Sequence, residues 1–233
     1  MHPFNSKKKK KNCMLTINVH SDTTTVALSW LVFEVSMRPH IEAKIVAELM
    51  EVLNGRSVEE LEYDDLKNLK YTECVIKESL RLHPSVPIFG RFVEKEIDCG
   101  SFKIPANTEV FVPTTLIHRL PEQWGNPDVF DPERFTPERS AGRHPFAFIP
   151  FSAGSRNCIG QVFALNVEKT LLAYLMYNFH FEVADPLRAV HLPAIVLHPK
   201  FGIQVVGRER LPGELQTLAN LSKSSLSSFA SSL

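Results

Sequence analysis

The sequence is poor in cysteine, in long apolar runs and in excess charge of either sign. Its four cysteines, Cys13, Cys74, Cys99 and Cys158, form no CxxC pair, which argues against a structural zinc site and a disulfide scaffold and favours a reducing compartment. The 26 basic and 26 acidic residues cancel, so overall charge does not favour a nucleic-acid partner. The most apolar later stretch, Val26 to Val35, is shorter than the roughly 20 residues that span a bilayer.

The two ends of the chain differ in composition from the middle. Five consecutive lysines, Lys7 to Lys11, indicate a solvated tail or, alternatively, a nuclear or anionic-surface signal, and no apolar segment follows them as in a secretory leader. Residues 215–233 are rich in serine. We therefore predict a lysine-rich, unrelated or disordered segment over residues 1–18, a folded unit over residues 19–210 and a serine-rich disordered tail over residues 211–233.

The folded unit is expected to be mainly α-helical with a small antiparallel β-sheet. Apolar residues at helical spacing predict helices over residues 22–37, 40–53, 66–82 and 159–177. Residues 121–150 form a long irregular segment, punctuated by proline, and such segments are usually functional. Short strands are predicted over residues 94–97, 102–104, 109–112, 179–183, 190–197 and 201–206.

The strongest chemical signal is F-x-x-G-x-R-x-C-x-G, with five fixed residues in the ten positions 151–160. Cys158 stands where a loop opens into a predicted helix, and the positive end of a helix stabilises a thiolate. Gly154 and Gly160 permit turns and close approach of the backbone to a flat ligand. Phe151 can pack against such a ligand, and Arg156 can form a charge-assisted bond to an acidic group on it. The alternative is a buried free cysteine in an incidental loop.

This motif resembles the cysteine-ligand loop of cytochromes P450, and two further signatures follow that family's order. Glu78 and Arg81 match the E-x-x-R of its helix K, and Arg134 belongs to a PERF segment at residues 132–135. The resemblance implies a buried network of these three charged residues. It covers roughly residues 21–207 and corresponds to helices I to L, the C-terminal half of the family's fold, so the chain is interpreted as a partial, truncated P450 haem domain.

The resemblance also implies a cofactor, heme b, with Cys158 as the axial ligand of the iron. Phe151, Gly154, Arg156 and Gly160 would contact the macrocycle. Arg91 is a further candidate for binding a propionate, with a solvated surface charge as the alternative. His118 corresponds to a frequent histidine of the family and is expected to be structural.

The amino-acid sequence of the loop is most similar to that of P450 family 4, the fatty-acid ω-hydroxylase branch. That similarity implies hydroxylation of a small lipophilic, aliphatic substrate with O2 and electrons from an NADPH-cytochrome P450 reductase, at the endoplasmic reticulum membrane, although no membrane anchor is visible. Asp22 and Thr23 resemble the family's proton-delivering acid–threonine pair, with helix capping as the alternative. The family's preceding glycine is His20 here. The position of its haem-esterifying glutamate is Val19, so no covalent haem ester is predicted.

Two other functions remain open from the sequence. The first is a non-catalytic fragment that binds haem weakly or not at all, because about half of a typical family member has no counterpart here and apolar faces would be exposed. The second is a nucleic-acid binder, which rests on Lys7 to Lys11 alone.

Overall fold

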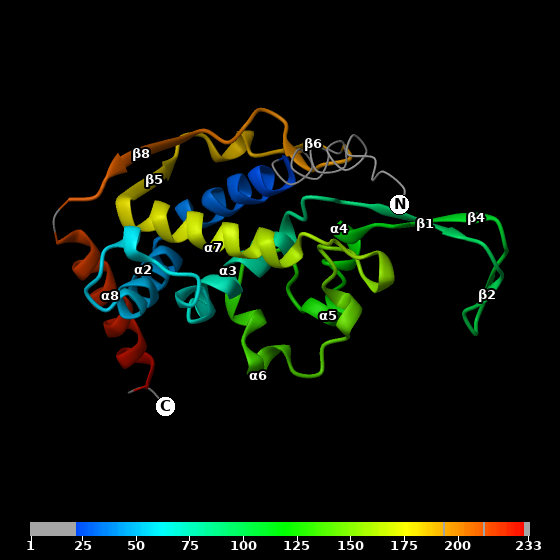
Figure 1. The fold of residues 1–233 in the computed structure, drawn as a ribbon, viewed down its shortest axis with the longest axis horizontal. Coiled ribbons are helices and arrows are strands. Elements are labelled where there is room, and N and C mark those ends of the chain that lie inside the picture. Colours follow the sequence, from blue (N-terminus) through cyan, green and yellow to red (C-terminus); the bar gives the residue numbers. More distant parts are fainter. Residues whose placement is uncertain (1–21, 193, 212, 231–233) are drawn as a thin grey trace, which may run out of the picture.

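A computed structural model describes residues 22–230 apart from positions 193 and 212, with side chains described as far as residue 222. The expected segment over residues 1–18, together with Val19 and His20, lies outside the described residues. Five longer helices dominate the fold (Figure 1): residues 22–36 (called helix 22–36), α2 (Pro39–Leu53), α3 (Lys70–Leu82), α7 (Gln161–Asn178) and α8 (Glu214–Ala230).

Local sequence explains where these helices begin and end. Proline occupies the first position of α2, where its missing N–H costs no hydrogen bond. Asn54 ends α2 in the left-handed conformation with a φ of 48°, and its N–H bonds to the carbonyl of Met50. His83 and the following Pro84 end α3. Four of the helices expected from the sequence are therefore present, with ends within a few residues of the prediction.

The main core lies where helix 22–36, α2, α3 and α7 meet. Leu31, Ile45, Ile76 and Leu172 are each at most 1% exposed within it. In Figure 1, α7 runs along the middle of the molecule, with α2 and α8 near one end of it and the β1–β4 pair extending away at the other. Burying the apolar faces of these helices against one another stabilises the fold, at roughly 25 cal/mol per Å² of apolar surface removed from water.

In the described residues, the strands form four separate two-stranded antiparallel sheets. The pairs are β1 (Phe89–Val93) with β4 (Thr108–Val112), β2 (Ile97–Asp98) with β3 (Lys103–Ile104), β5 (Phe179–Val183) with β8 (Val205–Glu209), and β6 (His191–Leu192) with β7 (His198–Pro199). The predicted class, mainly α with small antiparallel sheets, is confirmed. Some strand boundaries differ from the predicted ones, since β1 ends before Glu94 and β8 begins only at Val205.

The proline-rich stretch expected to be irregular consists of short helical turns. Within residues 121–150 they are α5 (Pro121–Trp124), η3 (Pro132–Phe135), α6 (Pro137–Ser140) and η4 (Pro145–Ala147). The helix α4 (Thr114–Ile117) precedes this stretch, and η5 (Gly154–Arg156) follows it in the ligand loop. Proline starts α5, η3, α6 and η4, as its fixed φ favours. Further 3-10 turns are η1 (Val58–Glu60), η2 (Asp65–Lys67) and η6 (Pro186–Arg188).

The predicted disordered tail over residues 211–233 is wrong for most of its length, because α8 occupies Glu214–Ala230. Leu215 and Leu218 pack against the main core, and Ala219 is 4% exposed. These positions repeat at helical spacing and lay one face of α8 along α2 (Figure 1). A serine-rich composition therefore concealed a narrow apolar stripe.

Within the described part of the chain, no helix is both long and apolar enough to cross a membrane.

Candidate functional site

The loop that carries Cys158 is held in shape by its own backbone. The N–H of Cys158 donates to the carbonyl of Phe151 at 2.9 Å, which closes the loop into a compact turn. Gly154 has a φ of +80°, a conformation that L side chains rarely adopt, so the fixed glycine at this position has a clear physical reason. Gly160 is buried and caps the start of α7. Cys158 therefore stands just before the N-terminus of a long helix, as predicted.

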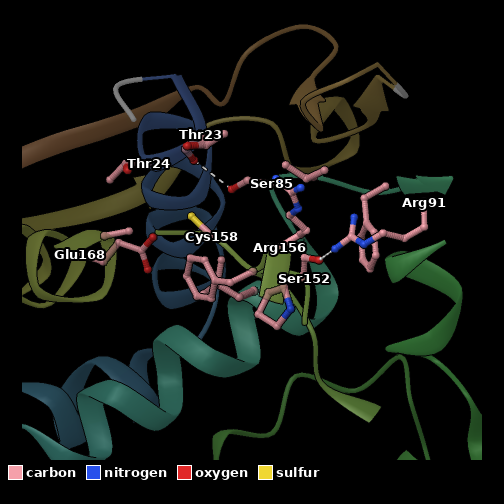
Figure 2. Close-up of a pocket in the computed structure, with 14 residues that line it drawn as sticks. Thr23, Thr24, Ser85, Arg91, Ser152, Arg156, Cys158 and Glu168 are labelled. Atoms are coloured by element: carbon pink, nitrogen blue, oxygen red, sulfur yellow. Dashed lines mark hydrogen bonds between the residues drawn. The ribbon is translucent and has the colours of Figure 1, made fainter. Parts of the chain in front are cut away.

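A cavity of about 300 Å³ lies in front of this loop (Figure 2). Of the residues predicted for the site, Phe151, Arg156, Cys158, Arg91 and Thr23 line it. The remainder of its wall is largely apolar and comes from helix 22–36, α3, the segment after it, the first residue of β1, the ligand loop and α7: Thr24, Leu80, Ser85, Val86, Phe89, Pro150, Ser152, Ala164 and Glu168. Gly154 and Gly160 do not line the cavity and shape the loop instead.

Two arginines lie on one side of Cys158 in this cavity. Arg91, on β1, donates hydrogen bonds to the hydroxyl of Ser152 and the carbonyl of Gly90, and its guanidinium stacks 4.7 Å from the ring of Phe89. Ser152 has a φ of +63°, and its side chain meets Arg91 (Figure 2). No carboxylate pairs with Arg91 or Arg156 among the described residues, so both positive charges are available to an anionic group in the cavity.

The predicted acid–threonine pair is divided between two environments. Thr23 lines the cavity, and its backbone carbonyl accepts a hydrogen bond from the hydroxyl of Ser85 at 2.9 Å (Figure 2). Asp22 does not line it: its carboxylate lies 3.6 Å from Nε2 of His198, and the side chain is 54% exposed. The structure therefore brings Thr23, but not Asp22, to the site.

The predicted charged network is present and buried behind the site. Glu78 and Arg81 form a two-pronged ion pair at 2.7 and 2.8 Å, and both side chains are 0% exposed. Arg134 approaches the same carboxylate, with Nε 3.4 Å from Oε1 of Glu78. Burial raises the pKa of Glu78, and the two guanidinium groups oppose that rise.

This network ties α3 to the chain that leads into the ligand loop. Arg81 donates to the carbonyls of His118, Pro127 and Val129, and Arg134 donates to those of Trp124 and Asn126. The N–H of Asp131 donates to Glu78 at 2.8 Å. Since proline-rich turns form few hydrogen bonds with each other, these charge-assisted bonds fix their course.

Sequence reasoning missed Glu168 as part of the site. It lies on α7, is 2% exposed and faces the cavity (Figure 2). Burial raises the pKa of its carboxyl to about 8. A signal was available, because Ala164, Glu168 and Leu172 follow one another at intervals of four, and an acid within an apolar stripe is unusual.

Comparison with known proteins assigns this arrangement to a family. The profile of the cytochrome P450 family matches residues 2–205, most of the chain. The chain belongs to the cytochrome P450 family. It is 42% identical over 190 residues to cytochrome P450 4V2 of Mus musculus, 39% over 185 residues to cytochrome P450 4c3 of Drosophila melanogaster, and 40% over 174 residues to cytochrome P450 4F12 of Homo sapiens.

These matches cover 81%, 79% and 73% of this chain but only 36%, 35% and 33% of the respective relatives. The chain thus spans about a third of the length of the curated relatives that it matches. The predicted resemblance to family 4 is confirmed by these relatives, all of which carry a family 4 name.

Proposed function

We propose that this chain forms the cysteine-bearing wall of a haem-thiolate monooxygenase site, with heme b bound in the cavity and Cys158 as the axial ligand. One observation carries the proposal: the thiol of Cys158 and two arginines without carboxylate partners line the same largely apolar cavity. A thiolate can ligate haem iron, and two free guanidinium groups can pair with the two carboxylates of the macrocycle. When bound, the haem would supply the binding and activation of O2 for hydroxylation.

The residues of the chain divide the binding of this cofactor among them. Cys158 would donate its thiolate, and Arg91 and Arg156 would pair with the propionates on one side of it. Phe151 and Ala164 would pack against the macrocycle, while Gly154 and Gly160 keep the loop in the shape that presents Cys158. The network of Glu78, Arg81 and Arg134 would hold the loop in place without touching the cofactor.

The finer function follows the family 4 relatives. We infer hydroxylation of an aliphatic substrate such as a fatty acid, electrons from an NADPH-cytochrome P450 reductase, and a location at the endoplasmic reticulum membrane. Thr23, at the cavity wall, is the remaining candidate of the acid–threonine pair for handling protons. Asp22 could take part in proton handling only if its carboxylate moved away from His198 and toward the cavity.

Haem titration tests the proposal. The purified chain is expected to bind one haem, with a saturable change in the Soret band. Cys158→Ala should lose that change, and Cys99→Ala, which alters an exposed cysteine outside the cavity, should keep it. If wild type takes up no haem, the competing function, a fragment without cofactor, replaces this one. Large exposed apolar side chains near the loop, Ile159 at 95% and Phe163 at 62%, favour that competing function.

A further inference from the structure

Glu168 is a buried acid without a counterion in the part of the chain that the structure describes. It is 2% exposed, and the described part of the chain offers its carboxyl neither a salt bridge nor a hydrogen bond. Its neighbour Lys169 does not compensate it, because the Lys169 ammonium is bound to the carbonyl of Leu66 and the carboxylate of Glu73. An ionised carboxylate in such surroundings is strongly disfavoured, and protonation removes the cost.

The carboxyl group faces the cavity that contains Cys158. In Figure 2, Glu168 lies on one side of Cys158, and Arg156 and Arg91 lie on the other. Among the described residues, the other ionisable side chains that line the cavity are Cys158, Arg156 and Arg91. From helix 22–36, Thr23 and Thr24 face the cavity, and Asp22 pairs with His198 outside it. Among the described residues, no basic group forms an ion pair with Glu168, and burial is the one cause of its pKa shift.

Burial alone accounts for the raised pKa of about 8. At neutral pH the carboxyl is therefore mostly protonated, and it ionises in mildly alkaline solution. A charge that appears in a cavity of low dielectric acts strongly on other charges in the same cavity.

We propose that Glu168 is a positioning residue that sets the charge of the haem cavity, present as a neutral carboxylic acid at neutral pH and as an anion beside the cofactor in alkaline solution. This inference rests on the proposed haem site. A new negative charge near the iron stabilises the more positive ferric state relative to the ferrous state. The reduction potential of the bound haem should therefore fall as pH rises through about 8.

The experiment measures the reduction potential of the haem-loaded protein from pH 6 to about pH 9.5, a range that brackets the ionisation of Glu168. Wild type should show a fall centred near pH 8, and Glu168→Gln should lack it, because glutamine keeps the shape of the neutral acid but cannot ionise. Glu138→Gln, the same change at an exposed carboxylate on α6, should behave as wild type.

A second readout needs no cofactor. In the haem-free chain, a folded-state pKa near 8 against an ordinary value of 4.5 means that the unfolded chain releases this proton first as pH rises. The free energy of unfolding should thus decline between those two values in wild type relative to Glu168→Gln.

The outcomes separate the inference from the proposed function. Haem uptake with a thiolate spectrum, but the same dependence of potential on pH in wild type and Glu168→Gln, overturns the inference and leaves the haem site standing. Failure of wild type to bind haem overturns both. Uptake with a pH-dependent difference in potential, matched by the difference in unfolding free energy, supports both.

Discussion

Arg81 and His118 are joined by two hydrogen bonds that run in opposite directions. Nη1 of Arg81 donates to the backbone carbonyl of His118 at 3.0 Å, and Nδ1 of His118 lies 3.2 Å from the carbonyl of Arg81. Nε2 of His118 accepts from the N–H of Ile149 at 2.8 Å, just before the ligand loop. The ring therefore needs one nitrogen with a proton and one without, and it connects α3 to the loop only when it is neutral.

Acid should therefore destabilise this chain well above the pH at which most carboxylates titrate. Burial lowers the pKa of His118 to about 3 and that of His191 to about 4, from an ordinary value of 6.5. The unfolded chain takes up these protons near pH 6.5 and the folded chain does not, so the stability that these two histidines contribute is complete above pH 6.5 and falls as pH decreases toward the folded-state values. Glu168 contributes with the opposite sign in this range, so the comparison with a histidine variant isolates the effect.

Denaturant titrations at pH 7.5, 6.5 and 5.5 measure this effect, with a slope of about 1.4 kcal/mol per pH unit for each proton. His118→Asn should be less stable at neutral pH and should show a shallower slope than wild type. Equal slopes for both proteins would contradict a neutral, buried His118.

The buried ion pair predicts a large loss on removing one partner. Arg81→Met removes the two-pronged partner of Glu78 at 0% exposure, leaves, among the described residues, only Arg134 near its carboxylate at 3.4 Å, and breaks three bonds to backbone carbonyls. We expect a loss of about 3–5 kcal/mol in the free energy of unfolding. Lys67→Met breaks an exposed pair with Asp64, which solvent screens, and should leave stability close to that of wild type. Similar losses in the two variants would refute the structural role of the network.

The two arginines of the cavity predict a graded loss of haem affinity. In the proposed haem site, Arg156→Gln and Arg91→Gln would each remove a charge-assisted bond to a propionate, which is worth about 1.5–3 kcal/mol, or roughly 10- to 100-fold in the dissociation constant. Arg188→Gln, at an exposed arginine on η6, serves as the control. Haem titration by absorbance measures all three, and unchanged affinity in both cavity variants would reject the assignment of the propionate side.

We expect the packing of α8 against α2 to contribute to the free energy of unfolding. Ala219 is 4% exposed on α8, and the helix packs along α2. Ala219→Asp would bury a charge there and should cost about 1–3 kcal/mol, while Gln216→Asp on the exposed face should stay within about 0.5 kcal/mol. Thermal or denaturant unfolding distinguishes the two. A silent Ala219→Asp would mean that the tail does not pack as a helix.

Most of the fold and site features that the sequence predicts come from local motifs. Fixed spacing in the sequence predicts the ligand loop, the Glu78–Arg81 pair and Arg134, and apolar periodicity predicts the longer helices. Glu168 and Asp22 show where such reasoning ends. Spacing places Glu168 on the buried face of α7, but the cavity that this face lines, and the partner of Asp22 at His198, depend on tertiary packing that no spacing encodes.

The tail was misjudged for a related reason. A serine-rich composition is typical of a disordered segment. The burial of Leu215, Leu218 and Ala219, however, depends on the apolar surface of α2 beside them. Tertiary contact decides the structure of a weakly helical segment, because packing supplies most of the stability of short helices.

The spectrum of the reduced, haem-loaded chain under carbon monoxide shows whether Cys158 ligates the iron, because the position of its Soret band reports whether a thiolate binds the iron. We expect the long-wavelength band of a thiolate-ligated haem in wild type and in Cys99→Ala, and its loss in Cys158→Ala. A wild-type band at the shorter wavelength of other ligands, or one that survives in Cys158→Ala, would contradict ligation by Cys158.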